Sequence, residues 1–274
     1  MRTLCIFLRT RVSFETGAYQ MGGDAIFYDM STSPLGAGKE SIHDTAKTLS
    51  RYVDLIMARL FEHEKIQKMA RYAEVPVING LTDFKHPCQV VSDLLTIREY
   101  KGTLDELTLA YLGDARNNVT HSLLYGCTTM GMNIRVGCPE GDHYSPLPEV
   151  VSDARAAATI TGATVEVTHD PLVAVQGADV IYTDSWMSYH VAKEELDARV
   201  KALTPFQVDS RELALGAPEA IFMNCLPAMR GYEQTAEVID GAQSVVFDQA
   251  ENRLHAQKAI MAKLLGGSRP QRRE

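Results

Sequence analysis

The sequence has 274 residues, which suits one large or two modest domains, and 45% of them are hydrophobic, which is ordinary for a globular protein with a real core. Its 27 lysines and arginines against 35 aspartates and glutamates give a formal net charge of −8. This argues against a nucleic-acid-binding protein, because no basic excess is available to neutralise phosphates along a duplex. A single anionic metabolite stays compatible, since a pocket can be locally basic inside an acidic protein.

Short apolar runs alternate with amphipathic stretches along the whole chain. The apolar runs predict strands over Ala25–Tyr28, Leu55–Met57, Val75–Ile78, Leu107–Leu112, Ile134–Gly137, Thr164–Thr168, Val180–Thr183, Ile221–Asn224 and Val245–Phe247. The amphipathic stretches predict helices over Arg11–Met21, Ile42–Tyr52, His63–Tyr72, Pro87–Tyr100, Asn118–Met130, Pro148–Thr161, Ala192–Ala202 and Ala250–Leu265. This alternation is typical of an α/β protein with mostly parallel sheets flanked by helices.

The predicted elements fall into two halves. We expect a first domain over residues 1–101 and a second over 102–249. The last helix, over 250–265, has an apolar face that would return it to the first domain. The tail, 266–274, is rich in Gly, Pro and Arg, and we expect it to be flexible.

The number and spacing of the cysteines and the lengths of the apolar runs indicate in which cellular compartment the protein resides. The five cysteines are scattered, odd in number and without a CxxC pair, which argues against a disulfide framework or a structural zinc site. Leu4 to Leu8 is too short for the core of a signal peptide. No other apolar run reaches the roughly 18 residues that a membrane span needs. We therefore expect a cytoplasmic protein with reduced thiols.

Cationic and neutral hydrogen-bonding side chains stand at the ends of predicted elements in the first half. Arg9 and Thr10 precede a helix, where exposed N–H groups favour an anion, and Arg59 follows a strand. His86 and Gln89 flank the first turn of another helix. Each residue alone has an ordinary explanation, such as a surface arginine or a helix cap. Together they suit a small phosphate ester that bears a carbonyl.

Polar residues also follow the predicted strands of the second half. Asn117 and Asn118 come after a Gly-Asp turn, where an asparagine can cap the next helix. Asp184 follows a strand and could hold the ammonium group of an amino acid. Cys225 follows another strand, where it could face a ligand or be a buried cysteine with a purely structural role.

Several motifs resemble the carbamoyltransferase family, and the ornithine carbamoyltransferases most closely. They are Arg9-Thr10-Arg11, His86-Pro87-Cys88-Gln89, Gly113-Asp114-Ala115-Arg116-Asn117-Asn118, Asp184-Ser185-Trp186, Asn224-Cys225-Leu226-Pro227 and Asp248-Gln249-Ala250-Glu251-Asn252-Arg253. The resemblance runs from Arg9 to about Leu265. It implies transfer of the carbamoyl group of carbamoyl phosphate to the side-chain amine of L-ornithine, giving L-citrulline and phosphate, with no cofactor and no metal.

The resemblance also implies residue roles and an assembly. Catalysis would fall to His86, Arg59 and Cys225. Carbamoyl phosphate would bind to Arg9, Thr10, Arg59, His86, Gln89, Cys225, Leu226 and Arg253. L-ornithine would bind to Asn118, Asp184, Ser188 and Tyr189. The family forms trimers, so we expect a homotrimer or a multiple of trimers in which the loop carrying Lys39 reaches a neighbouring subunit's site.

Some positions depart from the family pattern. Leu8 stands where the family has Ser-Thr, and the family normally has a further segment ahead of this loop, so we expect a chain shortened at its N-terminus. Tyr189 and His190 replace Met-Gly, and Asn224 replaces His. Two alternatives therefore stay open. One is a carbamoyltransferase for a different amine, and the other is an impaired relative that binds without turnover.

Overall fold

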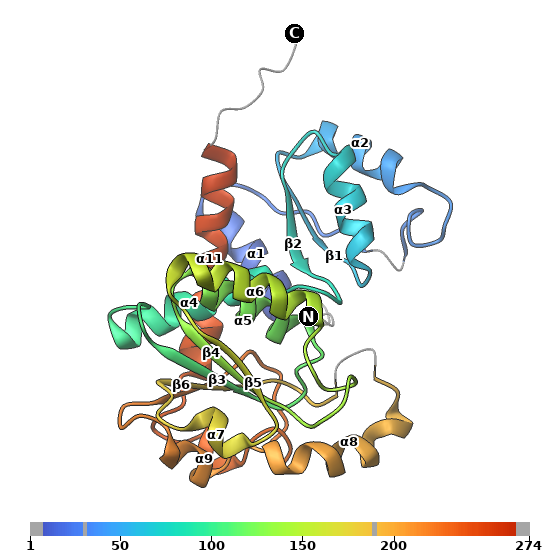
Figure 1. Cartoon of the computed structure of the whole chain (residues 1–274). Coiled ribbons are helices and arrows are strands. Elements are labelled where there is room, and N and C mark those ends of the chain that lie inside the picture. The colour runs from blue at the N-terminus through green and yellow to red at the C-terminus, as the bar shows by residue number, and fades with distance from the viewer. Residues whose placement is uncertain (1–7, 30–31, 188–190, 267–274) are drawn as a thin grey trace. The chain divides into compact units, whose positions relative to one another are not determined.

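Figure 1 gives the computed structural model of the chain, which describes residues 8–29, 32–187 and 191–266. Contacts divide the chain into two compact units. Unit 1 comprises Met1–Cys88 and Asn252–Glu274, and unit 2 comprises Gln89–Glu251. The predicted α/β class is confirmed, because every strand pairing is parallel and helices flank the sheets.

Unit 1 is built on a two-stranded parallel sheet of β1 (Ile56–Arg59) and β2 (Val77–Leu81). Its helices are α1 (Leu8–Gln20), α2 (Ile42–Tyr52), α3 (His63–Tyr72) and the part of α11 (Val246–Gly266) that starts at Asn252.

Side chains alternate across the sheet of unit 1 because successive residues of a strand point to opposite faces. Ile56 and Ala58 pack with Ala46 of α2 and with Ile66 and Met69 of α3. The other face buries Phe14 of α1, Ile78 of β2 and Met261 of α11 together with Cys88, and Leu55 and Met57 pack against this cluster. The predicted return of the last helix to the first half of the chain is thus confirmed.

Unit 2 contains a five-stranded parallel sheet with the order β5-β4-β3-β6-β7. The strands are β3 (Thr108–Leu112), β4 (Asn133–Gly137), β5 (Val165–Thr168), β6 (Val180–Thr183) and β7 (Ile221–Asn224). The helices are α4 (Pro87–Lys101, within unit 2 from Gln89), α5 (Asn118–Thr129), α6 (Pro148–Thr161), α7 (Pro171–Val175), α8 (Leu196–Leu203), α9 (Ser210–Leu215) and α10 (Ala236–Ile239).

Helices cover both faces of this sheet, with α5 and α6 on one side and α7 and α9 on the other (Figure 1). Every residue of β6 and β7 is buried, as is usual for parallel strands covered on both faces. The strand order reverses between the neighbours β3 and β6. In open α/β sheets, ligands bind at the carboxyl ends of the strands at such a reversal.

Some sequence predictions are wrong. Ala25–Tyr28 forms no strand, and Ile26 is 84% exposed, because an apolar run becomes a strand only where a partner strand accepts its backbone hydrogen bonds. Val245–Phe247 is not a strand either, since α11 begins at Val246 and a short apolar run cannot be distinguished from a buried helix start. The helix expected over Ala192–Ala202 is divided into a 3₁₀ turn at Lys193–Glu195 and α8.

The short helices α7, α9 and α10 of unit 2 were not predicted from the sequence. The first turn of α7 carries recognisable signals, because Asp170 caps it and Pro171 follows at its first position. Asp209 and Glu212 form a reciprocal capping box at the start of α9. Within the described ranges, no helix is long and apolar enough to cross a membrane.

Candidate active site

Arg59 ends β1, and a register shift in the sheet sets the place of its side chain. Ala58 pairs with Asn79, whereas Arg59 pairs with Leu81, so Gly80 is the extra residue of a bulge. A Cβ on Gly80 would lie 2.6 Å from the Met57 Sδ and 3.2 Å from the Ala58 carbonyl oxygen, so only glycine fits there without a shift. Beyond this bulge, the Arg59 Nη1 donates to the Thr10 Oγ1 at 3.0 Å.

Arg253 reaches the same hydroxyl from α11. Its Nη2 donates to the Thr10 Oγ1 at 3.3 Å, and the residue is only 2% exposed. The helix predicted over Ala250–Leu265 would have Arg253 in its first turn, which is wrong, because α11 begins seven residues before Arg253, at Val246. Thr10 lies in the first turn of α1 and is buried, so its hydroxyl brings two guanidinium groups together within unit 1.

His86 precedes the first residue of α4 and is 4% exposed. Burial holds the pKa of His86 well below its ordinary value, and the positive charges of Arg253, Arg59 and Arg9 lower it further. The imidazole is therefore neutral near pH 7, when it still offers one N–H donor. Unit 1 thus brings together Arg9, Thr10, Arg59, His86 and Arg253 from four parts of the chain.

The lowered pKa of His86 predicts a specific pH dependence of stability. In the unfolded chain this imidazole takes up a proton as the pH falls below about 6.5, whereas in the fold it stays neutral to lower pH. The unfolded state then binds more protons, so stability is full above that pH and falls on acidification. We expect wild type to lose up to about 1.4 kcal/mol per pH unit from this group, a slope that His86→Gln removes. Urea unfolding of both proteins at pH 7.5 and 5.5 measures how much free energy of unfolding each loses on acidification. An equal loss in wild type and in His86→Gln contradicts a lowered pKa of His86.

Gln89 is part of unit 2 and is held by a buried carboxylate. Its Nε2 donates to the Asp93 Oδ1 at 2.8 Å, one turn further along α4. Asp93 is fully buried and also accepts from the Gln249 Nε2 at 2.7 Å and from the Tyr182 hydroxyl at 3.1 Å. Sequence reasoning missed Asp93, although an acid one turn after Gln89 in a largely apolar helix was a visible signal. Asp93 fixes the side-chain direction of Gln89 within its own unit.

Three of the predicted site residues, Asn118, Asp184 and Cys225, follow three neighbouring strands of unit 2. Asn118 begins α5 after β3, and the predicted helix cap is confirmed, since the Asn117 side chain accepts from the Thr120 N–H at 2.8 Å. Asp184 follows β6 and Cys225 follows β7, directly after the paired residues Thr183 and Asn224. The Cys225 Sγ donates to the Asp184 Oδ1 at 3.1 Å. Parallel pairing therefore brings Asp184 and Cys225 to one edge of the sheet.

Asn224 holds the turn that follows β7. Its Oδ1 accepts from the Leu226 N–H at 2.8 Å, and its Nδ2 donates to the Gln234 Oε1 at 3.0 Å. Leu226 has a positive φ of 55°, an uncommon backbone conformation for a leucine. Asn224 is fully buried, so its role in unit 2 is to fix the backbone that carries Cys225 and Leu226.

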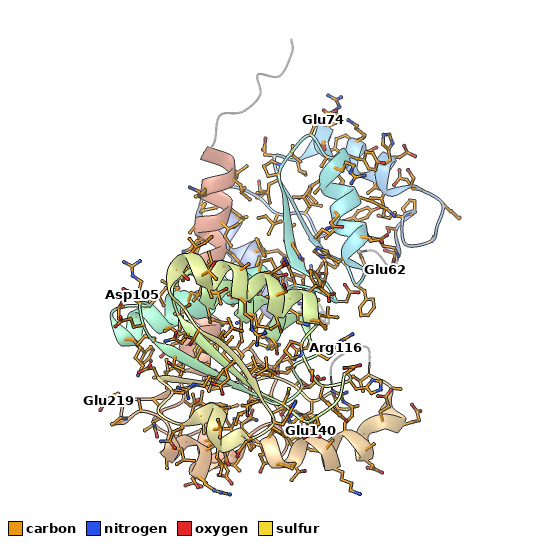
Figure 2. All side chains as sticks on the ribbon, viewed as in Figure 1. Glu62, Glu74, Asp105, Arg116, Glu140 and Glu219 are labelled. Atoms are coloured by element: carbon orange, nitrogen blue, oxygen red, sulfur yellow. The ribbon has the colours of Figure 1, made fainter. Side chains whose placement is uncertain are left out.

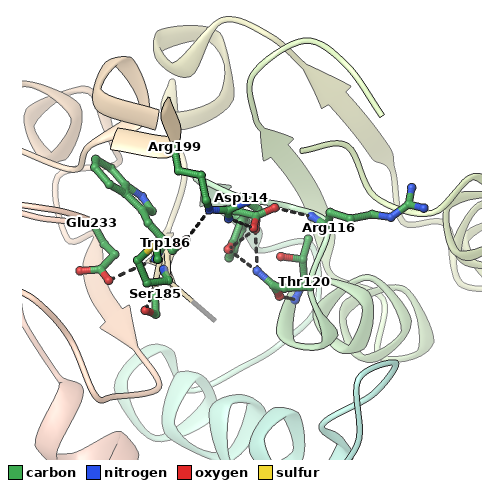
Figure 3. A network of polar contacts seen from close by, with 10 residues as sticks. Asp114, Arg116, Thr120, Ser185, Trp186, Arg199 and Glu233 are labelled. Carbon is green, nitrogen blue, oxygen red and sulfur yellow. Dashed lines mark hydrogen bonds and ion pairs between the residues drawn. The ribbon is translucent and has the colours of Figure 1, made fainter. Parts of the chain in front are cut away.

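A buried ionic network supports the backbone after Asp184 (Figure 3). Arg199 of α8 forms an ion pair with Asp114, and its Nε donates to the Trp186 carbonyl oxygen at 2.8 Å. Glu233 accepts from the Trp186 N–H at 3.2 Å and from the Met229 N–H at 3.0 Å. Burial raises the pKa of Glu233, against the stabilising effect of these N–H donors. The Trp186 main chain is thus held through both its N–H and its carbonyl.

The remaining predicted site residues are not placed in these clusters. Ser188 and Tyr189 lie outside the described residues. Lys39 is exposed in a turn ahead of α2. Among the described residues, no group of three His, Cys, Asp or Glu side chains could hold a metal ion.

Several acidic side chains lie on the surfaces of the two units. Glu62, Glu74, Asp105, Glu140 and Glu219, which Figure 2 labels, are all exposed. The arginine cluster of unit 1 is therefore a local exception in an acidic protein. An open depression of about 410 Å³ lies beside the start of α6, but its lining includes none of the predicted site residues.

Comparison with known proteins gives the family. Residues 7–99 match the family model for the carbamoyl-P binding domain of aspartate/ornithine carbamoyltransferase, and residues 105–264 match the model for its Asp/Orn binding domain. The chain belongs to the aspartate/ornithine carbamoyltransferase family. An ornithine carbamoyltransferase of Methanothermobacter thermautotrophicus is 54% identical over 258 residues, which are 94% of this chain and 84% of that protein. One from Thermococcus kodakarensis is 51% identical, over 94% of this chain and 81% of its own length.

Solved structures of the family share the fold. The ornithine carbamoyltransferase structure from Pyrococcus furiosus is 48% identical and superposes with a TM-score of 0.91, covering 96% of this chain and 83% of that chain. The family's carbamoyl-P binding region contains Arg9, Thr10, Arg59 and His86 of this carbamoyltransferase. Asn118, Asp184 and Cys225 fall in the Asp/Orn binding region. The two clusters thus correspond to the two family regions, apart from Arg253, which α11 adds to the first.

Proposed function

We propose that this chain transfers the carbamoyl group of carbamoyl phosphate to the side-chain amine of L-ornithine, releasing L-citrulline and phosphate, as a step of arginine metabolism. The observation that carries the proposal is the gathering of Arg9, Arg59 and Arg253 around a neutral His86 in unit 1. Forked guanidinium groups suit a phosphate dianion, and a neutral imidazole can donate to a carbonyl oxygen. Relatives at about half identity, each named ornithine carbamoyltransferase, support ornithine as the amine.

The proposed reaction is a direct transfer without metal or cofactor. The neutral amine of ornithine attacks the carbamoyl carbon and the carbon–oxygen bond to phosphate breaks. The new C–N bond forms as phosphate leaves with the electron pair of the broken bond, and the proton that the amine loses ends on the phosphate. His86 donates to the carbamoyl oxygen as negative charge develops there. Holding the two reactants in line contributes most of the remaining rate, on the order of 7–11 kcal/mol when the geometry is good.

We assign the binding roles by unit. In unit 1, Arg9, Thr10, Arg59 and Arg253 hold the phosphate of carbamoyl phosphate, and His86 contacts its carbonyl. From unit 2 we assign to the same substrate Gln89, Cys225 and Leu226. L-ornithine is assigned to Asn118, Asp184, Ser188 and Tyr189. The carboxylate of Asp184 suits the ammonium group, and its contact with the Cys225 thiol orients it.

One assay tests the proposed function. Purified protein receives carbamoyl phosphate with ornithine, lysine or putrescine, and the ureido product and phosphate are both quantified. We expect product with ornithine and far less with the other amines. A different preferred amine supports a changed specificity, and absence of every product supports an impaired relative. Inorganic phosphate binding, measured in parallel by calorimetry, separates a lost anion site from a lost chemical step.

We also propose a cytoplasmic homotrimer in which Lys39 completes a neighbouring subunit's site. The exposed position of Lys39 supports this role, and none of the described cysteines forms a disulfide. Lys39→Ala and Arg253→Met are each expected to have at most about a hundredth of wild-type activity alone. When equal amounts of the two variants are dissociated, mixed and reassembled, about a quarter of wild-type activity should return. Each site then needs Arg253 from one subunit and Lys39 from its neighbour, and random assembly supplies both at about a quarter of the boundaries. Reassembled mixtures without activity contradict a shared site, and light scattering reports the assembly.

A further inference from the structure

A polar chain lies behind Arg253 inside unit 1. Gln257 stands one turn after Arg253 on α11 and is fully buried. With the amide assigned so that its oxygen faces the guanidinium, the orientation that satisfies both neighbours, the Gln257 Oε1 accepts from the Arg253 Nη2 at 2.8 Å and from the Nε at 3.2 Å, and its Nε2 donates to the Ser13 Oγ at 2.5 Å. The opposite amide orientation would turn the Gln257 nitrogen toward the guanidinium, donor against donor. Gln257 therefore fixes the Arg253 side chain along two of its N–H directions.

Ser13 extends this chain into the first turn of α1. Its hydroxyl donates to the carbonyl oxygens of Arg9 and Thr10, the latter at 3.2 Å. The two helices approach closely here, because a Cβ on Gly17 would lie 3.1 Å from the Lys258 Cγ. The amide of Gln257 thereby connects the arginine of α11 to the turn that carries Arg9 and Thr10.

We propose that Gln257 is a positioning residue for the phosphate-binding arginines, holding Arg253 through a neutral acceptor so that the guanidinium keeps its charge for the substrate dianion. The inference rests on the proposed function, since it takes the phosphate of carbamoyl phosphate as the anion. Gln257 itself is assigned no contact with the substrate. It acts through Arg253, and through Ser13 on Arg9 and Thr10.

The charge state of the acceptor decides the effect. Burial lowers the pKa of His86 most, and the positive charges of Arg253, Arg59 and Arg9 lower it further, so these arginines make the local potential positive. An amide oxygen accepts the Arg253 N–H groups without reducing this potential. A carboxylate in the same place would form a buried ion pair with Arg253, and that negative charge would repel an incoming dianion. Glutamine is thus the side chain that orients the guanidinium and preserves attraction for phosphate.

Two substitutions separate positioning from charge. Gln257→Glu keeps the size and the acceptor but adds a charge, and Gln257→Met keeps the length but removes the acceptor. We expect both to raise the KM for carbamoyl phosphate and the Kd of inorganic phosphate by about tenfold or more, with the KM for ornithine unchanged. Gln257→Glu should keep its Tm, because its carboxylate still pairs with Arg253. A merely structural role predicts no loss of phosphate affinity in the glutamate variant.

Gln67→Glu is the matched control, because it makes the same change of charge on the exposed face of α3. It should bind phosphate as wild type does. Wild-type phosphate affinity in both Gln257 variants overturns the inference, and so does wild-type affinity in Gln257→Glu alone. If Gln257→Glu does not fold, Ser13→Ala tests the same chain, and an unchanged phosphate Kd there overturns the inference. Calorimetry with inorganic phosphate needs no turnover, so this result is independent of whether wild type makes citrulline.

Discussion

Replacing Arg253 with methionine is expected to lower kcat/KM for carbamoyl phosphate by at least about a hundredfold. Methionine keeps a long apolar stem in the buried position but removes every N–H that could meet the phosphate. Hydrogen bonds to charged groups contribute about 1.5–3 kcal/mol each, so losing two of them amounts to about 3–6 kcal/mol, and each 1.4 kcal/mol is about tenfold. Steady-state kinetics with carbamoyl phosphate varied at saturating ornithine measure the effect.

Arg71→Met is the matched control, since Arg71 is exposed in the last turn of α3 and its loss removes the same charge. Thermal unfolding adds a readout independent of turnover. Phosphate should raise the Tm of wild type and of Arg71→Met, because a ligand that binds only the fold stabilises it in proportion to ln(1 + [L]/Kd). Arg253→Met should lose most of this stabilisation. Activity within a few-fold of wild type in Arg253→Met removes the arginine from the proposed site.

Arg199→Met is expected to destabilise the protein by about 3–5 kcal/mol, because it leaves the Asp114 carboxylate buried without its partner. The side chains of this pair are only 9% and 3% exposed. Arg199 also donates to the Trp186 carbonyl, so the backbone after Asp184 loses a restraint and the KM for ornithine should rise. Urea unfolding measures the first effect, and kinetics with ornithine varied measure the second.

A double-mutant cycle isolates the interaction. Asp114→Asn combined with Arg199→Met should be less destabilising than the sum of the single changes, since neither charge is then buried alone. Arg230→Met is the control, because Arg230 pairs with Asp240 in an exposed position where solvent screens the interaction. A loss in Arg199→Met no larger than that in Arg230→Met contradicts a strong buried pair.

Local patterns predicted the regular elements well. The bounds of α2, α3 and α6 are those expected from the sequence, and so are those of β6 and β7. These segments have a clear period, or a continuous apolar run bounded by turn residues, and both are properties of neighbouring residues. Ala25–Tyr28 has such a run but no strand beside it. The error shows that strand formation also depends on a partner that sequence patterns do not specify.

The site residues were predictable from the sequence, but most of the residues that support them were not. The residue types, a set of arginines with a histidine and an Asp184 at a strand end, were visible in the sequence together with the family motifs that they compose. Their supporting partners were not visible. Asp93 could have been suspected from its spacing to Gln89, but Arg199 lies 85 residues from Asp114 and carries no local signal. Gln257 likewise reads as one more polar residue of a C-terminal helix.

The chain by itself determined which chemical groups are present and which short segments coil or extend, because both depend on residues close together in sequence. Only the tertiary structure decided that Arg253 donates to a hydroxyl 243 positions away, that His86 is buried beside three cations and that Gln257 supplies a neutral acceptor. The reason is that the packing of Phe14, Ile78, Cys88 and Met261 in one core sets these distances. The burial of these groups and the lowered pKa of His86 follow from that packing, which no local stretch of the sequence reveals.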